Sequence, residues 1–294
     1  PPSDEGLREI LVAYPTTCER LEETGERGEG GDQTLVIDQK AEDGVFRELE
    51  KLHDQGARFR AVSEERGDVD FGSDDVVVVI DPIDGSLNAK RGIPHVGISI
   101  AVASGPTMHD VEFGFVADLG TGEEWIAQRG EGVTFDGEAL PTPPPERRTK
   151  HGKLEIVAIE SADPSWMAPA MSGLQESVHR IRAFGSVAIS LGQVALARVD
   201  GMATLWRTRA VDCAAGQLIV RESGGVVDFP GFPDLTAPLD LEPHAPLLRL
   251  HRLRRNVAHD VAPARHAAHD FSTSAIASAV SKSPASTSVA LFGT

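Results

Sequence analysis

The chain has 294 residues, of which 40% are hydrophobic and 25% charged, and its formal net charge is −17. This length can hold one large domain or two smaller ones with an ample core. The acidic balance argues against nucleic-acid binding, which needs a basic face. No apolar run reaches the length of a membrane span, so we expect neither a nucleic acid nor a membrane as a partner. The two cysteines, Cys18 and Cys213, form no disulfide framework and indicate a cytoplasmic protein.

The first half of the chain mixes helices with strands. Apolar residues at helical spacing predict a helix over 4–25, interrupted at Pro15, and a second helix over 38–55. Alternating residues predict a strand over 57–63, and five consecutive β-branched residues predict a fully buried strand over 76–80. Gly-marked turns then join the strands expected over 97–105 and 111–140.

The second half begins after a proline-rich run at 141–148, which marks the best internal boundary. Here the pattern predicts helices over 186–201 and from Asp212 to Gly224. The strands expected in this half are 154–161, 202–206 and 226–229.

Three segments follow from these boundaries. We expect an N-terminal α+β half over 1–145, a C-terminal α/β half over 150–243, and a tail over 244–294. The tail is rich in His, Arg, Ser and Ala, and its histidine spacing matches no metal-ligand pattern, so a poorly ordered tail is the favoured interpretation.

One acidic stretch, Asp-Pro-Ile-Asp-Gly-Ser at 81–86, directly follows the predicted buried strand. Pro82 fixes its own φ and Gly85 tolerates angles closed to other residues, so a tight turn should hold Asp81 and Asp84 close together. Carboxylate oxygens placed this way suit Mg²⁺. A Pro-x-Asp-Gly string is also an ordinary turn signal, and this stretch alone leaves both interpretations open.

Two further acidic sites are ambiguous when taken singly. Glu64 and Glu65 end a predicted strand, where a solvated loop is the simpler interpretation. Asp212 opens a predicted helix, where the simpler interpretation is an N-cap. The capping box is incomplete for that N-cap, because residue 215 is Ala rather than Glu or Gln.

In combination and in this order, these motifs resemble the inositol monophosphatase family, which also contains archaeal-type fructose-1,6-bisphosphatases. The resemblance covers about residues 5–240 and rests on Asp-Pro-Ile-Asp-Gly combined with an upstream Glu-Glu and a downstream Asp-x-Ala-Ala-Gly. It implies a layered α/β fold, with alternating α-β-α-β-α layers of the sugar phosphatase type, and a homodimer. The matching segments are 31–43, 63–65, 81–88, 185–201 and 211–216.

The resemblance also implies a role for each matching residue. Asp38 and the Ser86 hydroxyl would orient and deprotonate an attacking water. The substrate phosphate would be cradled by the backbone at Gly85–Ser86 and at Gly185–Ser186. Two or three Mg²⁺ ions would be bound by Glu64, Asp81, the Ile83 carbonyl, Asp84 and Asp212, with Asp81 bridging two ions and with Asp84 and Asp212 also facing the substrate.

Two departures from the family pattern bear on the substrate. Ser86 stands where family members usually have Thr, which keeps the hydroxyl but frees its rotamer. The interval 201–211 contains no carboxylate, whereas inositol-specific members place a Glu there for substrate hydroxyls. Arg207 and Arg209 stand in this interval instead and suit a second phosphate, although each is equally well explained as a surface or ion-pairing residue.

The sequence therefore predicts a Mg²⁺-dependent phosphomonoesterase acting on a small phosphorylated sugar or polyol, namely fructose 1,6-bisphosphate and/or inositol 1-phosphate. Four clustered carboxylates would repel one another without cations, and Mg²⁺ both relieves that repulsion and activates water. One alternative is a family phosphatase for histidinol phosphate or 3′-phosphoadenosine 5′-phosphate. Another is a non-catalytic member that binds metal or phosphate.

Overall fold

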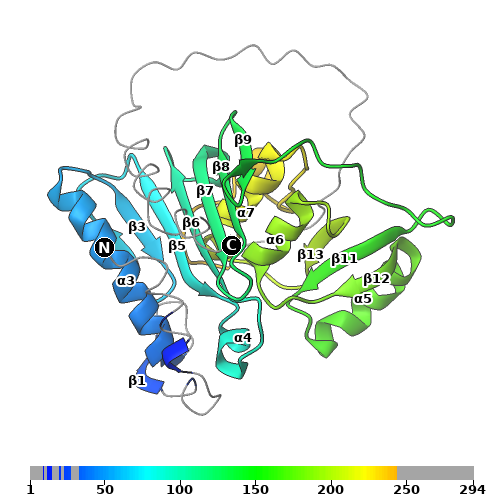
Figure 1. Ribbon diagram of the computed structural model, residues 1–294, viewed down its shortest axis with the longest axis horizontal. Helices are drawn as coiled ribbons and strands as arrows, with labels where there is room; N and C mark the ends of the chain where they lie inside the picture. The colour runs from blue at the N-terminus through cyan, green and yellow to red at the C-terminus, as the bar shows by residue number, and fades with distance from the viewer. Residues whose placement is uncertain (1–8, 10–11, 15–19, 21–22, 28–32, 244–294) are drawn as a thin grey trace, which may run out of the picture.

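The computed structural model describes residues 9, 12–14, 20, 23–27 and 33–243. Helices and sheets alternate through it in layers (Figure 1). Helix α3 (Val36–Asp54) covers one face of an eight-stranded sheet, and helices α6 (Val187–Ala195) and α7 (Ala210–Glu222) cover the other. A three-stranded sheet and helix α5 (Pro164–Ser177) follow. This is the α-β-α-β-α layering predicted from the sequence.

The eight-stranded sheet has the order β10-β9-β8-β7-β6-β5-β3-β4. Its pairs are antiparallel except for the parallel pair of β3 and β5. A separate antiparallel pair joins β1 (Glu23–Arg27) to β2 (Gln33–Leu35). The strands of the large sheet are β3 (Arg60–Ser63), β4 (Gly67–Asp70), β5 (Val77–Asp84), β6 (Gly97–Ala103), β7 (Val111–Asp118), β8 (Glu124–Gln128), β9 (Gly132–Phe135) and β10 (Glu138–Ala139).

Strand β5 lies in the middle of the layers and is buried along its whole length. Successive side chains of a strand point to opposite faces, so its apolar residues divide between two cores. Val77 and Val79 join the core that contains α6 and α7, whereas Val78 and Ile80 join the core that contains α3. The buried strand predicted over 76–80 is confirmed, and the double packing holds its carboxyl end rigidly.

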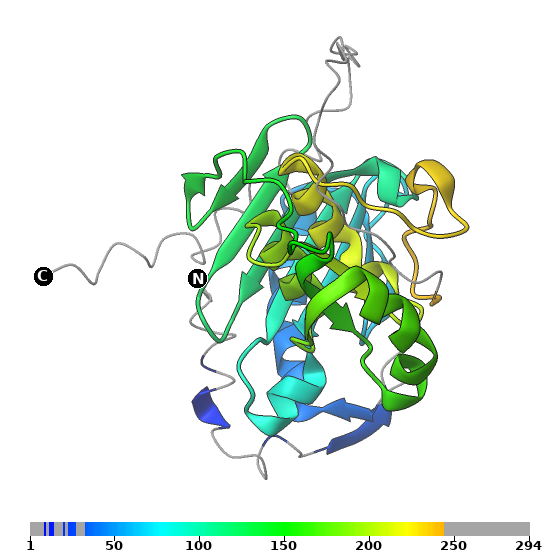
Figure 2. The same cartoon turned by 90° about the vertical axis from the view of Figure 1, so that its right-hand side faces the viewer.

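The three-stranded sheet is entirely parallel, with the order β12 (Val178–Arg182), β11 (Leu154–Glu160), β13 (Gly201–Thr204). Figure 2 views the molecule from the side of α5, which is the green helix nearest the viewer. Because all three strands run the same way, their carboxyl ends lie at one edge of this sheet.

Several sequence predictions are wrong at their boundaries. The helix expected over 186–201 ends at Ala195, because the backbone leaves the helical region at Ala197, which has φ 55°. Asp200 then accepts hydrogen bonds from the Arg147 and Ile156 amides. Residues 226–229 form no strand: Val227 and Phe229 are buried, but the segment has no ladder partner. The elements β2, β4, α4 (Ser86–Arg91), α5 and β12 were not predicted.

Other expectations fall partly or wholly outside the part of the chain that the structure describes. Most of the helix predicted over 4–25 lies there, and at its end Glu23–Arg27 forms strand β1 instead. The predicted tail over 244–294 lies there entirely. Among the described residues, no helix is long and apolar enough to cross a membrane. Two short 3-10 helices, Met108–Asp110 and Pro233–Leu235, complete the elements that the structure defines.

Close backbone contact between β7 and α7 makes Gly114 a test of this packing. A Cβ at Gly114 would lie 2.7 Å from the carbonyl oxygen of Ala215. We expect Gly114→Ala to lower the free energy of unfolding, measured by urea denaturation, by about 1–3 kcal/mol, because strand and helix must move apart.

The matched control is Gly173→Ala, at an exposed position of α5 with no heavy atom within 4 Å of the added Cβ. Better helix propensity should leave that variant equally stable or more stable by up to about 1 kcal/mol. Equal losses in the two variants would contradict the close packing.

Candidate active site

The site is built around the carboxyl end of β5. The strand continues through Asp81 to Asp84 with an irregular register against β6, so the turn predicted directly after Ile80 comes instead at Gly85. Gly85 has φ 92°, and a Cβ there would lie 3.0 Å from the carbonyl oxygens of both His95 and Gly185. Only glycine fits both the backbone angle and this space. Helix α4 (Ser86–Arg91) begins immediately afterwards.

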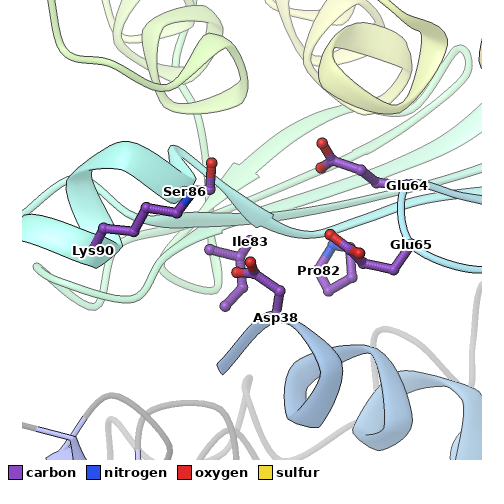
Figure 3. A pocket seen from close by; sticks show the side chains of 7 residues that line it. All are labelled: Asp38, Glu64, Glu65, Pro82, Ile83, Ser86 and Lys90. Carbon is purple, nitrogen blue, oxygen red and sulfur yellow. The ribbon is translucent and has the colours of Figure 1, made fainter. Parts of the chain in front are cut away.

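A pocket opens beside this strand end (Figure 3). Asp38 enters from the first turn of α3, Glu64 and Glu65 from the turn after β3, and Ser86 from the start of α4. The structure thus brings together three predicted site residues that lie far apart in the sequence: Asp38, Glu64 and Ser86. Pro82, Ile83 and Lys90 complete the lining.

The sequence analysis did not select Lys90 as a site residue. The sequence feature that could have pointed to Lys90 is its position four residues after Ser86 in a short helix, which places both side chains on one face. Lys90 therefore adds a cation to the pocket that also contains the Asp38, Glu64 and Glu65 carboxylates.

The carboxylates behind the pocket perturb one another. Burial raises the pKa of Asp81 well above its ordinary value, and the negative charges of Glu64, Asp84 and Asp212 raise it further. Burial likewise raises the pKa of Asp84 to about 7, although a hydrogen bond from Ser186 opposes the shift. The pKa of Glu64 is also raised by burial, against the lowering effect of the Arg209 charge. The four carboxylates thus lie close enough for each to perturb the charge of its neighbours.

Arg209 is the cation that balances this cluster in the structure. Its Nη2 lies 2.6 Å from Glu64 Oε1 and 3.1 Å from Asp212 Oδ1. The Arg209 backbone N–H donates to Asp212 Oδ2 at 2.9 Å. Arg209 is therefore the N-cap of α7 and Asp212 its third helical residue, so the prediction that Asp212 is the N-cap is wrong. By contrast, Arg207 is exposed.

The Gly185–Ser186 segment is held between two buried carboxylates. Asp84 Oδ2 accepts hydrogen bonds from Ser186 Oγ at 2.5 Å and from the Ala188 amide at 2.6 Å. Glu160 accepts from the Gly185 amide at 2.9 Å on its other side. The amide of Gly185, assigned to the phosphate cradle by resemblance, thus binds Glu160 here.

Glu160 was missed by the sequence analysis. Its carboxylate also accepts from the Phe184 amide at 2.9 Å and from Ser190 Oγ at 2.6 Å, so it fixes the start of α6. The only signal was a carboxylate at the end of an apolar strand, and its partners lie 24 to 30 residues away.

The donor set fits a hard divalent cation by its chemistry. Oxygen ligands from Glu64, Asp81, Asp84 and Asp212 are the kind that Mg²⁺ takes, and their mutual repulsion favours added positive charge. In the present side-chain arrangement, no three acidic, His or Cys side chains of the described residues could hold an ion. Two of the expected ligands, Glu64 and Asp212, contact Arg209 instead.

Comparison with known proteins identifies the family of this chain. It belongs to the inositol monophosphatase family, whose model matches residues 7–245. A protein of Methanothermobacter thermautotrophicus named fructose-1,6-bisphosphatase/inositol-1-monophosphatase is 33% identical over 211 residues, 68% of this chain and 72% of that protein. The Nus factor SuhB of Escherichia coli K12 is 31% identical over 218 residues, 71% of this chain and 76% of that protein.

A solved structure supports the fold. The crystal structure of an inositol monophosphatase–fructose 1,6-bisphosphatase matches with a TM-score of 0.69 and 24% sequence identity, over 86% of this chain and 92% of that chain. The family consists of metal-dependent phosphomonoesterases that typically use Mg²⁺, and some members have other roles.

The raised pKa values predict how stability depends on pH. Burial raises the pKa of Asp84 from 3.8, and that of Glu42 from 4.5, to about 7 in each case. Because the folded state then binds more protons than the unfolded state, stability must fall as pH rises from about 4 through about 7. We expect the Tm in the presence of a chelator to drop by roughly 5 °C or more between pH 5 and pH 8.

Added Mg²⁺ should raise the Tm more at pH 8 than at pH 5, because ligands bind it deprotonated. Glu42→Gln is the control: it removes part of the pH dependence but keeps the Mg²⁺ response, since Glu42 is not among the expected ligands. A Tm that ignores both pH and Mg²⁺ would refute this electrostatic account.

Proposed function

We propose that this protein is a Mg²⁺-dependent phosphomonoesterase that hydrolyses fructose 1,6-bisphosphate, inositol 1-phosphate or both. The observation that carries the proposal is the convergence of Asp38, Glu64 and Ser86 on one pocket beside the buried Asp81 and Asp84. Family membership supports the reaction class, and the Methanothermobacter thermautotrophicus relative supports the substrates by its name.

Within this proposal, each part of the site has a role. The metal ligands would be the carboxylates of Glu64, Asp81, Asp84 and Asp212 and the Ile83 carbonyl, holding two or three ions. When bound, Mg²⁺ lowers the pKa of water and neutralises charge on the transferred phosphoryl group. Asp38 accepts the proton of the attacking water, and the Ser86 hydroxyl orients that water toward phosphorus.

Binding of the phosphate group falls to the backbone at Gly85 and Ser86 and to Ser186 in the neighbouring segment, because the Gly185 amide is held by Glu160. Gly85, with φ 92°, lets the chain turn from β5 directly into α4, where Ser86 begins the helix. Lys90 adds a positive charge at the same pocket.

The choice between bisphosphate and monophosphate substrates rests on Arg207 and Arg209. Arg207 is exposed, and its guanidinium suits a second phosphate of the substrate. Arg209 can take the same role only after it leaves Glu64 and Asp212, which it contacts in the structure.

In keeping with the family resemblance, we propose a cytoplasmic homodimer.

The second candidate function is that of a family member which binds metal or phosphate without catalysis. Some members of the family have other roles, and the Escherichia coli relative is named as a Nus factor. The full set of expected metal ligands and the Asp38–Ser86 pair favour the enzyme.

The central test is phosphate release from inositol 1-phosphate and fructose 1,6-bisphosphate at millimolar Mg²⁺. We expect activity that a chelator abolishes, and a kcat about 10²- to 10⁴-fold lower in Asp38→Asn, because that variant loses the general base.

Glu50→Gln is the matched control, since Glu50 is an exposed carboxylate on the same helix, and its kcat should equal that of the wild type. No release from any phosphate ester at millimolar Mg²⁺ would exclude the enzyme and favour the binding role.

Arginine substitutions test the substrate assignment. Arg207→Ala and Arg209→Ala should each raise the KM for fructose 1,6-bisphosphate by more than the KM for inositol 1-phosphate. Only fructose 1,6-bisphosphate has a second phosphate whose contact with the arginine would be lost. Steady-state kinetics on both substrates measures this difference. Equal effects on the two substrates would assign the arginine to the carboxylate cluster or to the surface.

A further inference from the structure

Glu42 is a buried carboxylate that the site described above does not use. It lies on α3 one helical turn after Asp38, and only 1% of its surface is exposed. In the part of the chain that the structure describes, neither Glu42 oxygen meets a partner at full hydrogen-bond geometry. A buried carboxylate without full hydrogen bonding costs free energy, and such costs persist where function needs the group.

The groups that act on this carboxylate belong to the turn between β3 and β4. Burial raises the pKa of Glu42, and the Ser63 hydroxyl, the Arg66 charge and the Arg66 amide oppose that rise. Ser63 is completely buried, and its hydroxyl also lacks a partner at full hydrogen-bond geometry. The residue that follows Ser63 is Glu64. The Glu42 carboxylate therefore acts on the turn that carries an expected metal ligand.

Through this contact one side chain links two separate parts of the site. Asp38 lies on α3, whereas Glu64 and Glu65 follow β3, and all three line the same pocket (Figure 3). Residues four apart in a helix share a face, so Glu42 lies directly behind Asp38 along α3. The core between α3 and the sheet is apolar, and apolar packing is not directional. A polar contact is needed to fix the turn at one position.

A second link between α3 and this turn lies at the surface. Arg66 Nη2 is 2.6 Å from Oδ1 of Asp43, the residue after Glu42. The Asp43 side chain is 54% exposed, and exposed ion pairs contribute little. Asp43 therefore offers a matched control, because it contacts the same turn from the neighbouring position.

We propose that Glu42 is a positioning residue, which holds the turn after β3 against α3 so that Glu64 and Asp38 keep their places in one pocket. This inference rests on the proposed phosphomonoesterase function. It adds to that function a residue that touches neither the substrate nor the ions.

The test replaces the Glu42 carboxyl in two ways. Glu42→Gln keeps the shape and can still accept a hydrogen bond, whereas Glu42→Met fills the space without a strong polar atom. We expect titration calorimetry with Mg²⁺ alone to give a Kd about 10- to 100-fold weaker in Glu42→Met, as the loss of a supporting contact behind a metal ligand does. The Kd of Glu42→Gln should stay close to that of the wild type.

Stability separates positioning from a purely structural role. An apolar side chain in place of a buried, incompletely bonded carboxyl leaves stability equal or higher, so Glu42→Met should keep or raise the Tm in a chelator at pH 8. Asp43→Asn should change neither the Tm nor the Kd. Ser63→Ala should reproduce part of the loss of Mg²⁺ affinity and should add nothing to it in Glu42→Met, because the two residues act through one contact.

Three results would overturn the proposal. The first is an unchanged Kd in Glu42→Met. The second is a weaker Kd together with a lower Tm, which would assign Glu42 to general stability. The third is an equal loss of affinity in Glu42→Gln and Glu42→Met, which would assign the effect to the charge of Glu42 rather than to its contact.

The outcomes for this inference and for the proposed function are separate, because calorimetry needs no turnover. Weaker Mg²⁺ binding in Glu42→Met, in a protein that hydrolyses no phosphate ester, would support the positioning role and refute the enzyme. Hydrolysis of inositol 1-phosphate with the same kcat and the same Mg²⁺ dependence in Glu42→Met and wild type would do the reverse. A wild type that binds no Mg²⁺ would refute both.

Discussion

Burial of several negative charges at the end of one strand is the constraint on which the site depends. Asp81 and Asp84 are both almost fully buried, and Glu64 and Asp212 add their charges to them. Carboxylates in such surroundings either take up protons or acquire cations. The other residues of the site keep these carboxylates together.

The layered packing holds the carboxylates in place. β5 packs against a core on each face, so its carboxyl end stays buried. The start of α6 then reaches Asp84 through Ser186 and Ala188, while Glu160 binds the same segment from the neighbouring sheet. A carboxylate on each side thus fixes the segment, and the two sheets are joined through it.

Arg209 shows how one side chain can serve two demands. Its guanidinium partly neutralises Glu64 and Asp212, the same two carboxylates that are proposed to bind metal ions. Release from the carboxylates would free a cation close along the chain to the exposed Arg207. In the function proposed above, metal binding and substrate choice would thus be connected through Arg209.

The sequence by itself determined the features that depend on local pattern. Five β-branched residues specified the buried strand, helical spacing specified α3, and the order of the acidic motifs indicated the family. A local sequence pattern indicates backbone preference and burial, but not whether a partner strand is present. It therefore failed for 226–229, where buried and exposed residues alternate but no strand pairs with the segment. Only the tertiary structure decided that Asp212 follows an Arg209 cap, that Glu160 holds Gly185, and that Trp166 meets Trp206. The last two contacts depend on how separate layers pack, which no pattern within one segment encodes, whereas the Arg209 cap is a local contact whose arginine also reaches Glu64 in the other half of the chain.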